Sequence, residues 1–434
     1  MADARDEHDV LDDLIDIRDG FSGLQNPLGS LTDAVIDPSK VRQYDPSDYK
    51  ERPRSNSVFC TRCKASSLVS QEVADACCSL CLDICPVDAI EIHKASIRVL
   101  DTCRMCGLCT MVCPSEVFVA QRLMTRQLYD KIVRAASAHE QCYVTCTRAL
   151  GRLPKDNEVL LPCVGLIPRE LWFSLIADYD NVSVYLPLGI CDRCRTTTGE
   201  EAYATEISVA EEWSQASVGL EVDEGELNHE QTRAYRRGQF LNEMRRAGQA
   251  ALTSMNPALA GAQAVAKKVK DHADQLYRMQ QSLENAVGGK TSASRQRILT
   301  QKRRTVLGML QGHPALAGRM RLQVPSCDTT RCTMCDVCTR MCPVNACELD
   351  AQGHFSVETA YCINCAACVR VCPEDALTME TCDPSELVVR DKEAERRKRE
   401  AQQQMERAHK AAKEGRRQLN RALDALERLD DDTK

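Results

Sequence analysis

The sequence is poor in aromatic residues and has no long hydrophobic run. Phe, Trp and Tyr together make up 4% of its 434 residues, so we expect aliphatic packing and bound metal to stabilise the fold. No apolar stretch approaches the ~20 residues of a membrane-spanning helix, and the first residues lack the basic and apolar regions of a secretory signal. These absences predict a cytoplasmic protein without a transmembrane segment, in a compartment that keeps thiols reduced.

The sequence has no excess of basic residues and lacks the familiar catalytic motifs. The chain has 56 Lys and Arg against 63 Asp and Glu, and no basic patch interleaved with aromatic residues, which argues against a general nucleic-acid binder. It lacks a Gly-rich dinucleotide loop after a strand, a phosphate-binding P-loop, an HExxH helix and a nucleophile elbow. The chemistry therefore has to come from another residue type.

Cysteine is the residue in excess, with 26 copies. They are grouped in metal-ligand spacings and not scattered as in a disulfide framework. Three complete copies of the pattern C-x2-C-x2-C-x3-C-P are Cys103, Cys106, Cys109 and Cys113; Cys332, Cys335, Cys338 and Cys342; and Cys362, Cys365, Cys368 and Cys372. An incomplete fourth copy contains Cys78, Cys81 and Cys85. Three thiolates on one short loop are typical of an iron–sulfur site.

These motifs resemble the bacterial two-cluster ferredoxin family, over about 60 residues in each of two modules. The resemblance implies four [4Fe-4S] clusters, with the last Cys of each motif binding the neighbouring cluster. Three ligand sets are then complete: Cys103, Cys106 and Cys109 with Cys85; Cys332, Cys335 and Cys338 with Cys372; and Cys362, Cys365 and Cys368 with Cys342.

The fourth cluster lacks one ligand. Its remaining ligands are Cys78, Cys81 and Cys113, and the position expected for the missing Cys holds Asp75. The missing ligand is Cys60 or Cys63, which form a C-x2-C pair of their own, or Cys77, or Asp75; a three-iron cluster is a further alternative.

Residues 138–215 have the pattern of a small α/β domain. Short β-rich runs at 141–146, 158–162 and 181–186, with a helix-like segment at 169–177, predict a parallel sheet with crossover helices. The ends of these strands are followed by Cys146, Cys163, Cys191 and Cys194. Because parallel strands bind ligands at their carboxyl ends, we expect a fifth iron–sulfur cluster there, with structural zinc as the alternative. Cys142, inside its strand, is expected to pack.

This middle domain also resembles a known family more loosely. The stretch 161–168 followed by Cys191 and Cys194 resembles the iron–sulfur delta-subunit domain of methyl-viologen-reducing hydrogenases. That family links hydrogenases to heterodisulfide-reductase-type complexes. The chain departs from it by a wider first pair, Cys142 and Cys146, and by lacking a His-containing ending after Cys194.

The remaining segments predict mainly helices. Residues 1–55 are acidic and weakly structured, with an amphipathic stretch that either docks a partner or folds back. A helical pattern covers 117–139, residues 216–320 predict a long helical arm on which His272 packs, and Ser292 or Ser294 is expected to cap its last helix. Residues 386–434 predict a charged helix, and Cys327, Cys347 and Cys382 are expected as surplus or core thiols. The expected fold is α+β: two ferredoxin-like two-cluster modules, 56–120 and 322–382, flanking a small parallel α/β domain and a long helical hairpin.

The function predicted is one-electron transfer. The chain is expected to be a subunit that relays electrons between a donor oxidoreductase and a second redox enzyme, of the hydrogenase or heterodisulfide-reductase type. An alternative is an enzyme that reduces a disulfide or small molecule at Cys146, Cys163, Cys191 and Cys194. In a third interpretation that site holds structural zinc and the clusters serve regulation or assembly.

Overall fold

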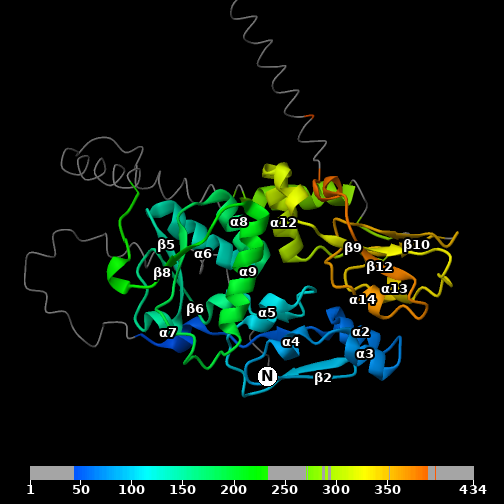
Figure 1. Cartoon of the computed structure of the whole chain (residues 1–434), viewed down its shortest axis with the longest axis horizontal. Coiled ribbons are helices and arrows are strands. Elements are labelled where there is room, and N and C mark those ends of the chain that lie inside the picture. The colour runs from blue at the N-terminus through cyan, green and yellow to red at the C-terminus, as the bar shows by residue number, and fades with distance from the viewer. Residues whose placement is uncertain are drawn as a thin grey trace, which may run out of the picture. The chain divides into compact units, whose positions relative to one another are not determined.

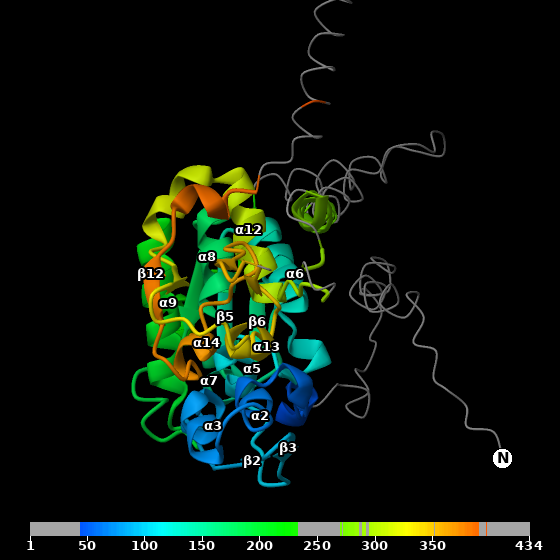
Figure 2. The same cartoon turned by 90° about the vertical axis from the view of Figure 1, so that its right-hand side faces the viewer.

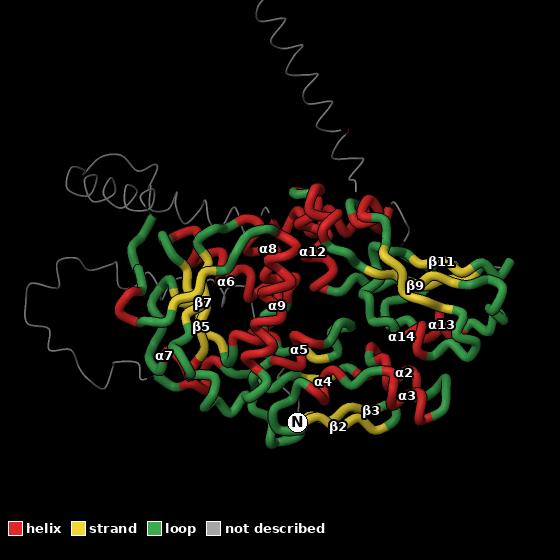
Figure 3. The backbone as a smooth tube through the Cα atoms, viewed as in Figure 1, coloured by secondary structure: helices red, strands yellow, loops and turns green. Residues whose placement is uncertain are grey.

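The computed structural model describes residues 44–232, 270, 272–285, 289–291, 295–350, 352–389 and 396. The described residues from Pro46 onward belong to one compact unit, which mixes helices with short strands (Figure 1 and Figure 3). This confirms the α+β class. The predicted amphipathic stretch near the N-terminus and nearly all of the predicted C-terminal helix lie outside the described residues.

The first cysteine-rich segment is built from two small antiparallel strand pairs. Strand β1 (Arg54–Ser55) pairs with β4 (Phe118–Val119), and β2 (Ile90–His93) pairs with β3 (Ser96–Val99). The 3-10 turns η3 (Pro46–Tyr49) and η4 (Ser57–Phe59) precede its helices, which are α2 (Thr61–Ala65), α3 (Gln71–Cys77), α4 (Leu80–Asp83) and α5 (Leu108–Val112). We call residues 54–119 the first module.

A second segment repeats this arrangement. Strand β9 (Gln323–Cys327) pairs with β12 (Leu377–Thr381), and β10 (Cys347–Leu349) with β11 (Phe355–Val357). Helices α13 (Val337–Met341) and α14 (Ala367–Arg370) follow its two cysteine loops, and η9 (Pro384–Leu387) follows the last strand. We call residues 323–381 the second module.

Between the modules in sequence lies a four-stranded parallel sheet. Its strands β5 (Cys142–Cys146), β6 (Glu158–Leu161), β7 (Val182–Tyr185) and β8 (Gly219–Glu221) are ordered β6-β5-β7-β8. Each pairing is parallel. The prediction of a small parallel sheet is therefore confirmed. The prediction that residues 216–320 are helical is wrong at β8, because Gly219 and Leu220 pair with β7.

Helices surround this sheet and build the largest core. They are α6 (Thr125–Ala138), α7 (Thr147–Leu150), α8 (Arg169–Asp178), α9 (Gly199–Ser214) and α12 (Gln301–Gly312), with the 3-10 turns η5 (Gln121–Leu123), η6 (Val164–Leu166), η7 (Glu224–Glu226) and η8 (Pro314–Arg319). Trp172 and Phe173 of α8 are fully buried in the core, and each contributes on the order of 2 kcal/mol by leaving water. The helical pattern at 117–139 begins only at Thr125, because Phe118 and Val119 pair with β1.

The helical arm is described in part. A helix over 272–285 buries Met279 and Leu283 against Leu307 of α12, and His272 stacks on Tyr129 of α6 with ring centroids 4.1 Å apart. The prediction that His272 packs is therefore confirmed. Ser292 and Ser294 lie outside the described residues; the side chain of Thr300 caps α12 by accepting from the Arg303 amide. Figure 2 shows α12 beside α8, which it contacts.

The two modules are in direct contact through short helices. Ala65, Ala74 and Cys77 of α2 and α3 share a buried cluster with Met341 and Ala367 of α13 and α14. Hydrogen bonds cross the same boundary, from the Lys64 ammonium to the Cys342 carbonyl at 3.0 Å and from the Arg370 guanidinium to the Cys77 carbonyl at 2.9 Å. The two cysteine-rich modules therefore pack directly against each other.

Candidate metal centres

Each Cys-Pro turn has the same local geometry. The third residue after each of these cysteines has a left-handed backbone: Asp88, Glu116, Asn345 and Asp375, with φ between 45° and 54°. That turn points the amide of the fourth residue at the sulfur, so Cys85, Cys113, Cys342 and Cys372 each accept an N–H bond at 3.2 to 3.5 Å. Such bonds stabilise a thiolate and help to set the potential of a bound cluster.

The three complete C-x2-C-x2-C loops share a second signature. The residues two and four positions after the first Cys are left-handed in each copy: Met105 and Gly107, Met334 and Asp336, and Asn364 and Ala366. Non-glycine residues rarely adopt this conformation, and each costs of order 1 kcal/mol. The three loops, whose residues between the cysteines differ, therefore share one backbone conformation that curls each loop around one cavity.

Three cavities are lined by the cysteines that the sequence groups together. One is lined by Cys85, Cys103, Cys106 and Cys109; a second by Cys332, Cys335, Cys338 and Cys372; and a third by Cys342, Cys362, Cys365 and Cys368. Each encloses about 20 Å³. The cross-over pairing brings these sulfurs around common spaces.

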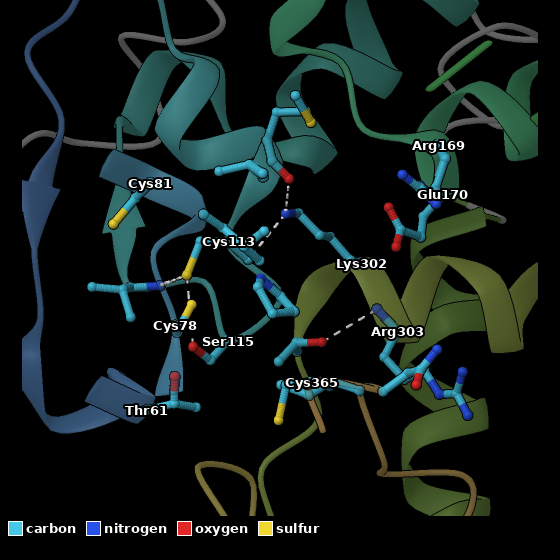
Figure 4. A pocket seen from close by; sticks show the side chains of 18 of the residues that line it. Thr61, Cys78, Cys81, Cys113, Ser115, Arg169, Glu170, Lys302, Arg303 and Cys365 are labelled. Atoms are coloured by element: carbon cyan, nitrogen blue, oxygen red, sulfur yellow. Dashed lines mark hydrogen bonds between the residues drawn. The ribbon is translucent and has the colours of Figure 1, made fainter. Parts of the chain in front are cut away.

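The fourth cavity is different in size and lining. The thiols that line it are Cys60, Cys77, Cys78, Cys81 and Cys113 of the first module and Cys365 of the second, and its volume is about 690 Å³. Charges on Cys113, Cys78 and Cys60 add to burial in raising the pKa of Cys81 to about 12, so these four sulfurs lie near one another. Figure 4 shows Cys78, Cys81 and Cys113 on one side of this cavity.

Helix formation explains why the incomplete motif departs from the others. Residues Gln71–Cys77 form α3, so Asp75 sits on a helix and not on a curled loop. Its carboxylate accepts from Arg62 at 2.8 Å and from Gln71 at 2.9 Å, and it is absent from the cavity wall. Cys63 is buried on α2 but does not line the cavity either. Cys60 at the start of α2 and Cys77 at the end of α3 remain.

The four thiols of the middle domain meet at one edge of the parallel sheet. Cys146 ends β5 and accepts from the Ala149 amide at 3.4 Å, while Cys163, Cys191 and Cys194 follow β6 and β7. Burial raises the pKa of Cys163 to about 12, and nearby charges on Cys146, Cys106 and Cys194 add to it. Cys142 packs instead, with its sulfur 3.7 Å from the Ile132 carbonyl.

The described residues contain no group of three or more His, Cys, Asp or Glu side chains that converges on a single ion position.

The sequence missed two thiols at these cavities. Cys327 of β9 lines the cavity of Cys332 and Cys372, and Cys347 of β10 lines the cavity of Cys342 and Cys368. Hydrogen bonding to Cys347 lowers the pKa of Cys342 to about 6. Cys347 was expected in the core and is buried there. Its position in the sequence did not predict that it also lines the cavity of Cys342 and Cys368. Cys382 is buried away from the cavities, against the core of the middle domain.

Two adjacent cations of α12 reach the two modules. The Lys302 ammonium donates to the carbonyls of Thr110, Met111 and Cys113 in the first module. The Arg303 guanidinium donates to Thr359 and Ala360 in the second, at 2.6 and 3.1 Å. Both groups are buried, so their charges are weakly screened at the thiol-lined cavities.

Comparison with known proteins gives one match. A family model described as a 4Fe-4S binding domain matches residues 355–378, which include Cys362, Cys365, Cys368 and Cys372. The chain therefore carries a 4Fe-4S binding domain. This iron–sulfur protein binds at least one [4Fe-4S] cluster, and the domain indicates a role in electron transfer. No curated protein and no solved structure matches the chain, and no helix among the described residues is long and apolar enough to cross a membrane.

Proposed function

We propose that the chain is an electron-transfer subunit that relays electrons through four [4Fe-4S] clusters and a fifth metal site. An iron–sulfur cluster supplies one-electron exchange, and the polypeptide sets its position, its potential and its access to partners. The observation that carries the proposal is that the groups of thiols adjoin one another in a series, from the middle domain through the first module to the second, by packing on shared buried clusters and by lining a common cavity.

The proposed ligand sets follow the cavities. Three are the complete cross-over sets, and the fourth is Cys60, Cys78, Cys81 and Cys113, with Cys63 and Cys77 outside it. The fifth is Cys146, Cys163, Cys191 and Cys194. Amide N–H groups already donate to five of these sulfurs in the two modules, which favours thiolates poised for metal.

Packing supports the order of the series. Cys163 of the middle domain and Cys106 of the first module pack on one buried cluster with Leu108. Cys81 and Cys109, from the two sites of the first module, share another.

The series continues across the module boundary. Cys365 lines both the large cavity and the small cavity that it shares with Cys342, Cys362 and Cys368. In the second module, Cys338 and Cys368 belong to one hydrophobic cluster. Neighbouring sites are thus connected by shared packing or by a shared lining residue, which supports electron transfer from one site to the next.

The two ends of the series approach solvent. Cys335 is exposed, and beside it Met334 is 58% exposed. At the other end Cys191 and Cys194 are half-buried, and the nearby Leu188 is 85% exposed. We propose that protein redox partners dock at these ends, of the hydrogenase or heterodisulfide-reductase type that the middle domain resembles.

The test is anaerobic iron, sulfide and zinc analysis of the purified protein, with EPR spectra before and after dithionite. About sixteen iron atoms in four cubes, plus iron at the middle site and magnetically coupled reduced signals, support the relay. A stoichiometric zinc with about sixteen iron atoms makes the middle domain structural. Fewer than four cubes contradict the proposed series.

A second candidate function is reduction of a disulfide or small molecule at the middle site. Tyr203 and Glu200 favour it, because both lie near Cys191, and a phenol and a carboxyl are groups that deliver protons. This function requires a metal with an open coordination position. Substitution of each of the four cysteines tests it, since a relay needs all four as ligands and a reductase leaves one replaceable.

A further inference from the structure

The large cavity exceeds what a cluster needs. Its volume is about 690 Å³, whereas each of the other three thiol-lined cavities has a volume of about 20 Å³. It extends from Cys78 and Cys113 past the beginnings of α8 and α12 to η8 and the loop before α14. Its volume is within the range of small-molecule sites, which form preferentially at boundaries between domains. We call this space the central chamber.

The wall of the chamber combines an apolar surface with a few charged groups. Trp213 of α9, Val306 of α12 and Met320 provide buried apolar surface. Arg319 and Arg321 stand at its exposed margin and form no ion pair within the described part of the chain. Unpaired guanidinium groups at a mouth favour an anionic ligand.

Three acids also line the chamber, namely Glu170, Glu206 and Glu212. Glu170, the second residue of α8, lines it opposite the cysteines, with Lys302 between them (Figure 4). Arg169 pairs with Glu206 and not with Glu170, and the Glu170 carboxylate has its own backbone amide as hydrogen-bond donor. Burial raises the pKa of Glu170; Lys302 and Arg169 oppose that rise, and Glu206 adds to it.

Two cluster sites border the chamber from different modules. Cys78, Cys81 and Cys113 belong to the first module, and Cys365 to the second. If both sites carry cubes, as the proposed function requires, the chamber has two one-electron donors. One bound molecule then has access to two electrons.

We propose that the central chamber binds a small quinone that carries an anionic substituent and accepts two electrons and two protons. A reduced cluster in each module would supply one electron and would itself be oxidised by one electron. The two carbonyl bonds of the quinone become two hydroxyl groups. Glu170 delivers one proton and is later reprotonated by water, and the second proton enters from solvent at the mouth. The chain would then be a branch point as well as a relay.

The test uses a sulfonated naphthoquinone and the cluster-loaded, full-length protein under anaerobic conditions. Calorimetry on the oxidised protein is expected to show one saturable site. Stopped-flow oxidation of the reduced protein is expected to reach a plateau rate as the quinone concentration rises. Without a site, the rate rises linearly at every concentration and calorimetry shows no saturation; either result overturns the proposal.

Variants separate binding from proton delivery. Arg319→Gln combined with Arg321→Gln is expected to weaken binding about tenfold or more, through lost charge-assisted bonds. Glu170→Gln is expected to retain binding and to slow the plateau rate on the order of 100-fold. The matched control is Arg98→Gln, at an exposed cation of β3 outside the chamber, and an equal loss in this control would contradict the chamber.

The proposed function and this inference fail separately. Iron analysis and EPR of the same samples report the clusters whether or not the quinone binds. Intact clusters without saturable binding reject only the chamber ligand. Missing cubes reject the relay itself.

Discussion

The ammonium of Lys302 donates to the carbonyl oxygen of Cys113 over 2.9 Å, although 189 positions separate the two residues in sequence. Lys302 is also held at the first module through Glu116, whose carboxylate accepts from the Gln301 and Lys302 amides at 2.9 and 2.7 Å. A helix from the middle of the chain thus fixes a buried positive charge beside a proposed cluster ligand.

We expect Lys302→Met to lower the reduction potential of one cluster. A nearby cation stabilises the reduced form, which carries one more negative charge, and losing about 1 kcal/mol of this stabilisation corresponds to roughly 40 mV. EPR-monitored redox titration measures the shift. Lys302→Arg keeps the charge and serves as the control; equal potentials in all three proteins would show that the charge has no influence.

The fourth ligand of the incomplete motif is tested by alanine substitution. We expect Cys60→Ala to lose one cube, about four iron atoms per chain, or to convert it to a three-iron cluster with a distinct EPR signal. Cys63→Ala, at the other cysteine of the same pair, is expected to keep all its iron, because Cys63 does not line the cavity. Loss of iron from Cys77→Ala and not from Cys60→Ala would assign the ligand to Cys77.

The sulfur of Cys163 leaves no room for a side chain at position 199, where the chain has glycine. A Cβ at this first position of α9 would lie 2.8 Å from Cys163 Sγ, closer than real contacts allow, so Gly199→Ala displaces the thiol. We expect this variant to lose the metal of the middle site and to keep the cubes of the two modules. Gly312→Ala at the end of α12 is the matched control, because a Cβ there meets nothing within 4 Å. Metal analysis that finds no difference between the two variants refutes this expectation.

We expect the fold to lose stability at acid pH when Glu158 of β6 becomes protonated. Burial alone would raise its pKa, but hydrogen bonds from Arg152 and the Lys155 amide outweigh burial and hold the pKa below its usual value. A carboxyl with a lowered pKa stabilises the fold fully above its unfolded value of about 4.3, and this stabilisation disappears as pH falls through the folded pKa.

Urea unfolding between pH 6 and pH 3 measures this contribution. We expect Glu158→Gln to cost about 2 kcal/mol near neutral pH and to flatten the pH dependence. Arg152→Met is expected to cost more, about 3 kcal/mol, because it leaves a fully buried carboxylate without its partner. Parallel pH profiles of the native chain and Glu158→Gln would contradict this account.

The sequence by itself determined the elements whose signals are local. The cysteine spacings predicted that the first three thiols of each complete motif share a cavity, because they lie on one short loop with its own turns. The fourth thiol of each small cavity was expected only from the resemblance to two-cluster ferredoxins. The β-rich runs predicted a parallel sheet, and the strand ends predicted where Cys146, Cys163 and Cys191 gather, because parallel strands end at one edge. These features depend on neighbouring residues, so a linear pattern contains them.

Only the tertiary structure decided the features that arise between distant segments. Asp75 lies outside the fourth cavity because α3 forms there, and Cys60 and Cys77 line this cavity because α2 and α3 bring them to Cys81 and Cys113. The thiols of Cys327 and Cys347 reach thiol-lined cavities across strand pairs, a relation that no spacing encodes. The chamber and the charge of Lys302 beside Cys113 exist because α8, α9 and α12 pack between the modules, and such packing depends on the shapes of surfaces that lie far apart in the chain.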